Sequence, residues 1–417
     1  MGKKNRKKSE FQKQLEAGFR TQTDMKMSEE KRKEQRYNKL ERIFNEFGDN
    51  KNRYLLYCPD IPFACTLVRT VYEHARLLNE LGFNAQIIHE VKGFKPSYLK
   101  AEESKGITIN YLQEKDKFGK LSKPDFSFFP TDSIIIPDGF WTVMTGFINT
   151  KTLHKIVLAT GYGGFYTAEP GANWSTLGFT DVLCLSEQLK EDYSKLWPEL
   201  KYHVTGYSID RESFKPLSKT EIQPSIALSC RSREDAQALI NIFYSKYPFL
   251  DLFQFRVLKK LDVENYTETL KRSSCLVFVD EKAGHPAPPL EALASNVPVI
   301  AVYGRGMEHL SEQEGMIWAP TNDLFILAEM IAEFCINWLE NNIAPLSVDK
   351  VLDNYDVKQV KSRLLSATKD LQAHKVKLFT AIKTAVDQGK LDETMLDDLV
   401  MPLENKGAQE PAMSVVK

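Results

Sequence analysis

Short apolar runs recur along most of the chain and alternate with segments of helical periodicity. In the first half these runs predict strands at Arg53–Cys58, Ala85–His89, Ile107–Leu112, Ser133–Ile136, Lys155–Ala159, Val182–Leu185 and Tyr202–Val204. Helices are predicted at Leu67–Leu81 and Glu187–Leu196, and the first of them ends at Gly82, a residue type that commonly stops a helix. Apolar runs of this length, separated by helices, are typical of parallel sheets covered on both faces. The first half therefore predicts a Rossmann-like domain.

The same alternation returns in the second half. Strands are predicted at Ser225–Ser229, Phe253–Leu258, Leu276–Val279, Val299–Val302 and within EGMIWAP, and helices at Ala236–Tyr247, Val263–Arg272, Asp323–Leu339 and Asp356–Gln372. Between the two halves lies GYSIDRESFKPLSK, a charged stretch with a proline and turn signals. Such a stretch is typical of a domain boundary.

A chain of 417 residues is too long for one hydrophobic core and favours two domains with extensions. The predicted division is 1–50, a charged helical extension; 51–215, a Rossmann-like acceptor domain; 216–345, a Rossmann-like donor domain; 346–375, a helix packing back toward the first domain; and 376–417, a polar tail.

Charge and cysteine content narrow the class of protein. The formal net charge of −1 gives no indication of a nucleic-acid partner, although a basic run over residues 3–8 could contact phosphates. The alternative is that this run is a solvated, frayed terminus. The six cysteines form no C-x-x-C pair, which favours buried free thiols in a reducing compartment. With no signal peptide and no apolar segment of membrane-spanning length, we expect a soluble cytoplasmic protein.

The segment 275–310 carries the most specific local chemistry. It reads as a buried strand, a Gly/Pro loop, a helix opened by Pro288 and Pro289, and a second buried strand. Ligands of open α/β folds bind at the carboxyl ends of such strands. Glu291 lies in the first turn of the helix, beside backbone N–H groups suited to a nucleotide's ribose and diphosphate. The alternative is that Glu291 only complements the helix dipole.

Four stretches then resemble a known family. They are DVLCLSEQLKEDY, YHVTGYSIDRESFKP, APPLEALASNVPVIA and GRGMEHLSEQEGMIWAPTNDLFILAEMI, which together span about residues 180 to 340. They are similar to the retaining, nucleotide-sugar-dependent glycosyltransferases that include sucrose and sucrose-phosphate synthases. The resemblance implies an α/β fold of GT-B architecture, in which two Rossmann-like domains face a cleft.

The resemblance also implies donor-binding residues. The arginines would hold the diphosphate, Glu291 the ribose, and the helix beginning near Pro288 would add backbone donors. The implied donor-side set is Arg231, Arg233, Gly284, His285, Glu291, Gly304, Gly306 and Glu308.

Two positions depart from the family pattern. Ala283 stands where the family has a glutamate for the sugar hydroxyls, and Asp280, Glu281 and His285 are the available substitutes. Ala236 stands where the family has a lysine for the diphosphate, and Arg233 is the available replacement.

The first domain would hold the acceptor, over the loop 59–66 and the Gly-rich, aromatic loop 161–178. The acceptor-side candidates are Asp60, Asp138, Gly161, Tyr162 and Trp174. Each has a plainer alternative: Pro-Asp-Gly around Asp138 is also a turn signal, and the aromatic residues suit the loop's own packing. His154 lies at the other end of its strand and is expected to be structural.

The function implied by the resemblance is transfer of a hexosyl or pentosyl group from a nucleotide sugar, with retention and without a metal or other cofactor. The seven histidines are scattered along the sequence and no Asp-x-Asp occurs, so no metal site is expected. A glycan, a lipid-linked glycan or a protein would be the acceptor. One alternative is a phage-type transferase acting on hydroxymethylated DNA bases. Another is a catalytically inactive GT-B-like binding protein, which would agree with Ala283 and Ala236.

Overall fold

The computed structural model describes residues 52–63, 65–94, 96, 104–115, 120–122, 126, 128, 131–148, 153–340 and 346–388, together with residues 31, 34 and 38. The charged extension predicted over residues 1–50 lies outside the described residues, apart from three helical positions. Of the helices in the described part of the chain, none combines the length and the apolar character needed to cross a bilayer.

The first sheet has the strand order β4-β3-β2-β1-β5-β6-β7-β8. Its strands are β1 (Arg53–Tyr57), β2 (Asn84–Val91), β3 (Thr108–Lys115), β4 (Leu121–Ser122), β5 (Ser133–Pro137), β6 (His154–Ala159), β7 (Asp181–Cys184) and β8 (Lys201–Val204). Neighbouring strands are parallel, except that β4 pairs antiparallel with β3. The two residues of β4 are too few to leave a periodic signal, and the sequence did not predict this strand.

Helices pack on this sheet as the alternation requires. They are α2 (Thr66–Glu80), α4 (Trp141–Gly146), α5 (Gly163–Tyr166) and α6 (Glu187–Leu196), with the 3₁₀ turn η1 at Ser175–Leu177. The predicted stop after α2 is confirmed, because Gly82 has a φ of +87° that a residue with a side chain rarely adopts. Helix α6 begins at Ser186, whose hydroxyl accepts the N–H of Leu189 at 3.2 Å.

The second sheet is fully parallel, in the order β10-β9-β11-β12-β13. Its strands are β9 (Gln223–Cys230), β10 (Gln254–Val257), β11 (Ser273–Val279), β12 (Val299–Val302) and β13 (Met316–Ala319). Its helices are α7 (Arg233–Lys246), α8 (Val263–Arg272), α9 (Ala287–Ala294) and α10 (Leu324–Leu339), with the 3₁₀ turns η2 (Lys219–Glu221), η3 (Pro248–Leu250) and η4 (Arg305–Leu310). Helices α7 and α10 cover one face of the sheet, and α8 and α9 cover the other.

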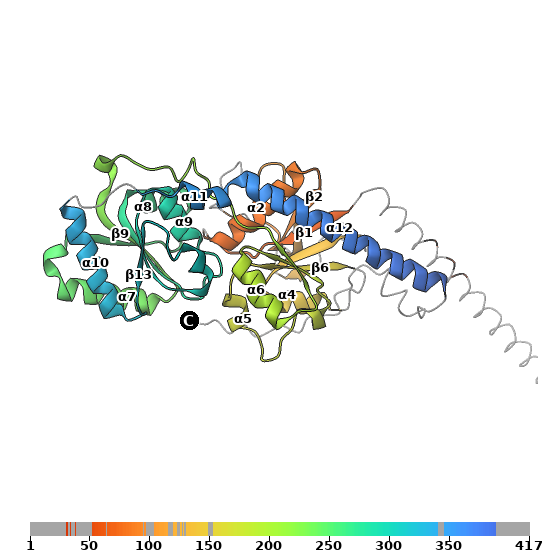
Figure 1. The fold of residues 1–417 in the computed structure, drawn as a ribbon. Coiled ribbons are helices and arrows are strands. Elements are labelled where there is room, and N and C mark those ends of the chain that lie inside the picture. The colour runs from red at the N-terminus through yellow and green to blue at the C-terminus, as the bar shows by residue number, and fades with distance from the viewer. Residues whose placement is uncertain are drawn as a thin grey trace, which may run out of the picture.

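The last helix, α12 (Val357–Asp387), follows the short α11 (Asp349–Leu352) and the 3₁₀ turn η5 (Asp353–Tyr355). Figure 1 shows α12 running from the second domain across the first. Its apolar residues complete the first domain's core: Val360, Leu364, Ala367 and Leu371. No Gly or Pro interrupts residues 357–388, so the helix continues beyond residue 375, and its last turns occupy the start of the predicted polar tail.

Candidate functional site

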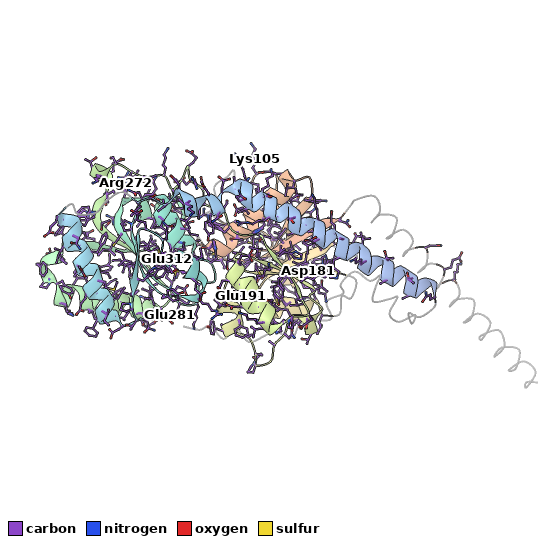
Figure 2. The ribbon with its side chains drawn as sticks, in the orientation of Figure 1. Lys105, Asp181, Glu191, Arg272, Glu281 and Glu312 are labelled. Atoms are coloured by element: carbon purple, nitrogen blue, oxygen red, sulfur yellow. The ribbon has the colours of Figure 1, made fainter. Side chains whose placement is uncertain are left out.

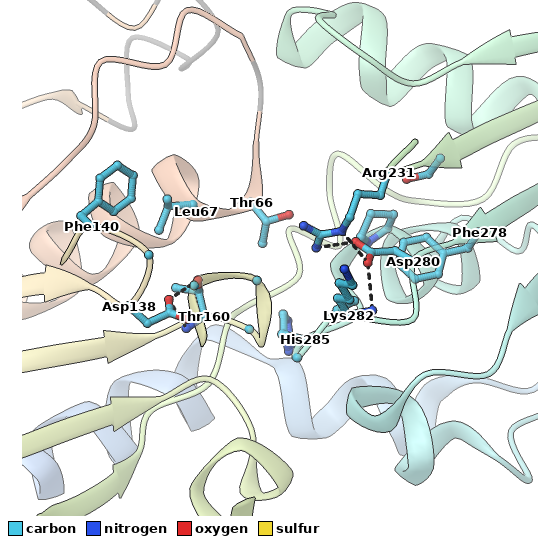
Figure 3. A pocket seen from close by; sticks show the side chains of 18 residues that line it. Thr66, Leu67, Asp138, Phe140, Thr160, Arg231, Phe278, Asp280, Lys282 and His285 are labelled. Atoms are coloured by element: carbon cyan, nitrogen blue, oxygen red, sulfur yellow. Dashed lines mark hydrogen bonds and ion pairs between the residues drawn. The ribbon is translucent and has the colours of Figure 1, made fainter. Parts of the chain in front are cut away.

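A cleft of about 340 Å³ lies where the carboxyl ends of the two sheets meet (Figure 3). The first domain lines it with the start of α2 and the loops after β5 and β6, and the second with the ends of β9 and β11 and the loop before α9. The lining residues are Thr66, Leu67, Asp138, Gly139, Phe140, Thr160, Gly161, Gly163, Gly164, Ser229, Arg231, Phe278, Asp280, Lys282, Ala283, Gly284, His285 and Pro288. Both Rossmann-like halves therefore present their usual ligand-binding edge to one space.

Arg231 lies in this cleft in a fixed orientation. Its Nε and Nη2 donate to the two carboxylate oxygens of Asp280 at 2.8 and 2.9 Å, while half of its side chain (51%) remains exposed. Asp280 also accepts the backbone N–H of Lys282 at 3.1 Å. A guanidinium held on one edge still presents its remaining N–H donors, the geometry that suits a phosphate. The same contacts occupy Asp280, so it is a poor substitute for the glutamate missing at Ala283.

The cleft contains a second cation that the sequence reasoning did not select. Lys282 lines the cleft, with its ammonium 4.9 Å from the ring centre of Tyr166. Lys282 follows β11 by three residues, at the carboxyl end of a predicted strand, and that position is the signal that could have identified it. Arg233, the expected second cation, begins α7 as an exposed residue and is not among the residues that line the cleft.

The glycines predicted on the donor side bring backbones together. A Cβ on Gly284 would lie 2.5 Å from Cα of Gly161, and one on Gly306 would lie 2.3 Å from the Ala283 carbonyl oxygen. A Cβ on Gly304 would lie 3.1 Å from the carbonyl oxygen of Glu281. Gly304 and Gly306 therefore pack against the backbone of the loop before α9, which lines the cleft. Glu308, in η4, is exposed and outside the lining.

His285 lines the cleft with an unusual environment. Only 6% of it is exposed, and neither ring nitrogen has a hydrogen-bond partner among the described residues. Its ring packs edge-on against Tyr207, with the ring centres 5.1 Å apart. Burial, with His309 nearby, lowers the pKa of His285 to about 3, so the imidazole is neutral at physiological pH. A buried polar group without a partner beside a cavity is a candidate for binding a ligand.

Glu291 has a different environment from the one expected of a ribose ligand. Its side chain is 2% exposed and pairs with Arg69 of α2, whose Nη1 lies 2.7 Å from Oε1. Tyr207 donates to the same oxygen at 2.8 Å, and Tyr266 donates to Oε2 at 2.6 Å. The carboxylate thus already accepts from three side chains and does not line the cleft.

On the acceptor side, the structure brings Asp138 and Gly161 into the cleft. Asp138 is buried at the carboxyl end of β5, and its Oδ1 accepts from the Thr160 hydroxyl at 2.9 Å and the Thr160 N–H at 3.1 Å. Burial raises the pKa of Asp138 to about 6, although those hydrogen bonds favour the ionised form. Asp138 is thus a cleft residue with a raised pKa, and shifted pKa values are frequent at functional sites.

The other acceptor-side candidates lie elsewhere. Asp60 accepts the N–H groups of Glu90 and Val91, both at 3.1 Å, and so fixes the end of β2. Tyr162 donates to Asp192 at 2.6 Å and is outside the lining. Trp174 is 0% exposed and packs among buried aromatic rings of the first domain. A fully buried ring offers no face to a substrate, so Trp174 is not a stacking surface. The sequence could not show this, because aromatic residues form the same patterns in binding surfaces and in cores.

Polar contacts close the two domains around the cleft. The Ser186 hydroxyl donates to the Gly284 carbonyl at 3.0 Å. Across the same boundary, Arg305 Nη2 donates to Asp192 at 2.6 Å. Both residues of the first domain, Ser186 and Asp192, lie at or in α6, so this helix contacts the second domain through the loop before α9 and through η4.

No protein-family model matches the sequence, and no curated protein sequence is significantly similar to it. Solved structures do match. The pneumococcal O-GlcNAc transferase GtfA, solved in complex with UDP and GlcNAc, is 10% identical, with a TM-score of 0.54 over 77% of this chain and 99% of that one. A glycosyltransferase from Rickettsia africae is 14% identical, with a TM-score of 0.52 over the same shares. At these identities the likeness shows the fold, and the predicted α/β fold of GT-B architecture is confirmed.

Proposed function

We propose that this protein is a glycosyltransferase that moves a hexose or pentose from a nucleotide sugar to an acceptor. The observation that carries the proposal is one cleft shared by two Rossmann-like edges, with Arg231 and Lys282 on one side and Asp138 on the other. Both solved structures named above are glycosyltransferases, and one of them contains UDP and GlcNAc. A uridine nucleotide is therefore the first donor to test.

On the donor side, the chemistry needed is stabilisation of negative charge on the departing diphosphate. Arg231, oriented by Asp280, and Lys282 supply two cations at the cleft. Helix α9 begins at Ala287, and Pro288 of its first turn lines the cleft, so the positive end of the helix dipole adds to the same field. Fixed donors of this kind act most strongly on charge that develops during the reaction.

On the sugar side, we assign the hydroxyl contacts to His285. Ala283 lines the cleft where the family has a glutamate, and its short side chain leaves room beside His285. A neutral imidazole offers one donor and one acceptor, which matches a sugar hydroxyl.

On the acceptor side, we assign Asp138 the orientation of the attacking hydroxyl, since it is the acidic side chain that the first domain contributes to the cleft lining. We further propose retention and no divalent metal at the donor site, where Arg231, Lys282 and the positive end of α9 would together offset the charge of the phosphates. The six free cysteines support a reducing compartment such as the cytoplasm.

A thermal-shift screen of the full chain against UDP-, GDP- and dTDP-sugars tests the proposal. A ligand at a hundred times its Kd should stabilise the native state by about 2.7 kcal/mol. Release of nucleoside diphosphate, with and without added Mg²⁺ or Mn²⁺, then measures turnover, and NMR of the product reports the anomer. Binding without turnover would favour the inactive binding protein considered above. If millimolar nucleoside diphosphates produce no shift, the proposal is wrong.

A further inference from the structure

Three of the seven histidines, distant in sequence, meet at one buried carboxylate. His154 begins β6, His203 lies in β8 and His374 lies in α12, while Asp181 begins β7. Figure 2 labels Asp181 in the first domain, where α12 crosses it. The histidines are therefore scattered in the sequence only, because parallel strands bring their starts to a common edge and α12 passes over that edge.

Each of the three imidazoles contacts the carboxylate, and two of them contact the same oxygen. Asp181 Oδ2 lies 2.9 Å from His154 Nε2 and 2.7 Å from His374 Nδ1, and Asp181 Oδ1 lies 3.2 Å from His203 Nε2. One ligand atom each from His154, Asp181 and His374 falls within 4.8 Å of the others. The edge of a zinc tetrahedron is about 3.4 Å for bonds of about 2.0–2.1 Å. Small side-chain rotations would bring these atoms to that spacing.

We propose that His154, Asp181 and His374 bind one divalent transition-metal ion of the zinc class, with solvent as its fourth ligand, at the edge of the first sheet where β6 and β7 begin. Two imidazoles and a carboxylate are a donor set that suits zinc better than magnesium or calcium. An ion here would take the place of the ring-nitrogen protons that now contact the carboxylate, and each neutral imidazole would then carry its proton on its other ring nitrogen. It would tie α12 to the starts of β6 and β7.

The surroundings are arranged as metal-binding imidazoles require. The Nδ1 of His154 lies 3.3 Å from the Ser133 hydroxyl, which orients the ring from behind. Asp181 and His154 are buried, whereas the His374 side chain is 23% exposed, which leaves access from solvent.

Lys375, next to His374, lies close to the site, because it shares the Ser133 hydroxyl with Nδ1 of His154. Its ammonium donates to the Thr131 carbonyl and to the Ser133 hydroxyl, on the β5 side. The site is also separate from the cleft. His154 starts β6 and Thr160 follows its end, so the six residues of the strand place the two sites about 20 Å apart.

Metal titration of the full chain, after dialysis against a chelator, tests this inference. We expect one Zn²⁺ per chain in competition with a chromophoric chelator, and Co²⁺ should give the visible bands of a four-coordinate ion. His374→Ala should lower the affinity at least about tenfold. Gln372→Ala, on the same helix but outside the cluster, should leave the affinity unchanged.

The result that overturns the inference is wild-type protein that shows no Co²⁺ bands, or His374→Ala that binds as tightly as the wild type. The Co²⁺ spectrum is measured on the wild type, so this part of the test does not depend on the folding of a variant. The His374 side chain is partly exposed, so its replacement by alanine should leave the fold intact. Nucleoside-diphosphate binding should be the same in His374→Ala as in the wild type. A negative result for the metal site would therefore leave the proposed donor site untouched, and a negative result for the donor site would leave the metal site untouched.

Discussion

Arg69 Nη1 lies 2.7 Å from Oε1 of Glu291, and this buried ion pair connects α2 of the first domain to α9 of the second. The hydroxyls of Tyr207 and Tyr266 complete the environment of the carboxylate. A residue expected to hold a ribose therefore joins the two domains. Removing one partner of such a pair leaves a buried charge uncompensated.

Glu291→Ala should lower the free energy of unfolding by about 3–5 kcal/mol, because the variant breaks a buried ion pair and removes the acceptor of two tyrosine hydroxyls. Urea unfolding measures this change. Glu312→Ala, an exposed glutamate on the same domain, should change it by no more than about 0.5 kcal/mol. If Glu291→Ala unfolds like the wild type and weakens only the binding of ribose-containing ligands, the residue is a ribose ligand instead.

Arg231→Ala should weaken nucleoside-diphosphate binding about 10- to 100-fold, since charge-assisted hydrogen bonds contribute about 1.5–3 kcal/mol. Arg256→Ala, exposed on β10, is the control, and calorimetric titration is the measurement. Arg233→Ala should have a smaller effect than Arg231→Ala because Arg233 does not line the cleft. Equal losses in the two variants would contradict the placement described here.

His285→Phe should separate stability from activity. The variant removes two unpaired ring nitrogens from a buried position, so its unfolding free energy should equal or exceed that of the wild type. Turnover of the nucleotide sugar should fall at least about tenfold, while nucleoside-diphosphate binding is kept. A gain in stability together with a loss of turnover is expected when a functional group destabilises the folded protein. Unchanged turnover would remove His285 from the sugar site.

Asp138→Asn tests the buried carboxyl group through pH. The folded-state pKa of about 6 exceeds the unfolded value, so the stability that Asp138 contributes is present below about pH 4 and is lost as the pH rises through 6. Between pH 4 and 7 the wild type should therefore lose about 3 kcal/mol relative to the variant. Asp251→Asn, an exposed control, should follow the wild type. A constant difference between Asp138→Asn and wild type would show that the pKa of Asp138 is not raised.

Gly284→Ala should push the two domains apart, because its Cβ would lie 2.5 Å from Gly161 Cα and 2.6 Å from Leu189 Cδ2. We expect a larger radius of gyration by small-angle scattering and a loss of turnover. Gly146→Ala, in α4, is the matched control, because a Cβ at this position would have no neighbouring atom within 4 Å. A variant with the wild-type radius and full turnover would mean that the contact yields easily.

The fold could be predicted from the sequence because local periodicity determines it. The runs around Leu276–Val279 and Val299–Val302 are apolar on both faces, as a covered parallel sheet requires, and both are strands. Helix α4 was missed because WTVMTG is short and rich in β-branched residues, so tertiary packing, not propensity, makes it helical.

The candidate site could be predicted only in part. Arg231 follows a strand and matches a family motif, and the structure places it in the cleft. The pairing of Arg69 with Glu291, 222 residues apart, depends on how the domains dock. The meeting of His154 with His374 depends on the path of α12. No single-sequence pattern encodes either relationship, because each partner lies on a different element.

The return of α12 also affects how the protein is made. Its residues Val360 and Leu364 belong to the core of the first domain, although they follow the whole second sheet in the chain. During synthesis, domains usually fold in order from the N-terminus. Here the ribosome must translate the entire second domain before it supplies the helix that completes the first. The second domain can therefore reach its final structure earlier than the domain that precedes it.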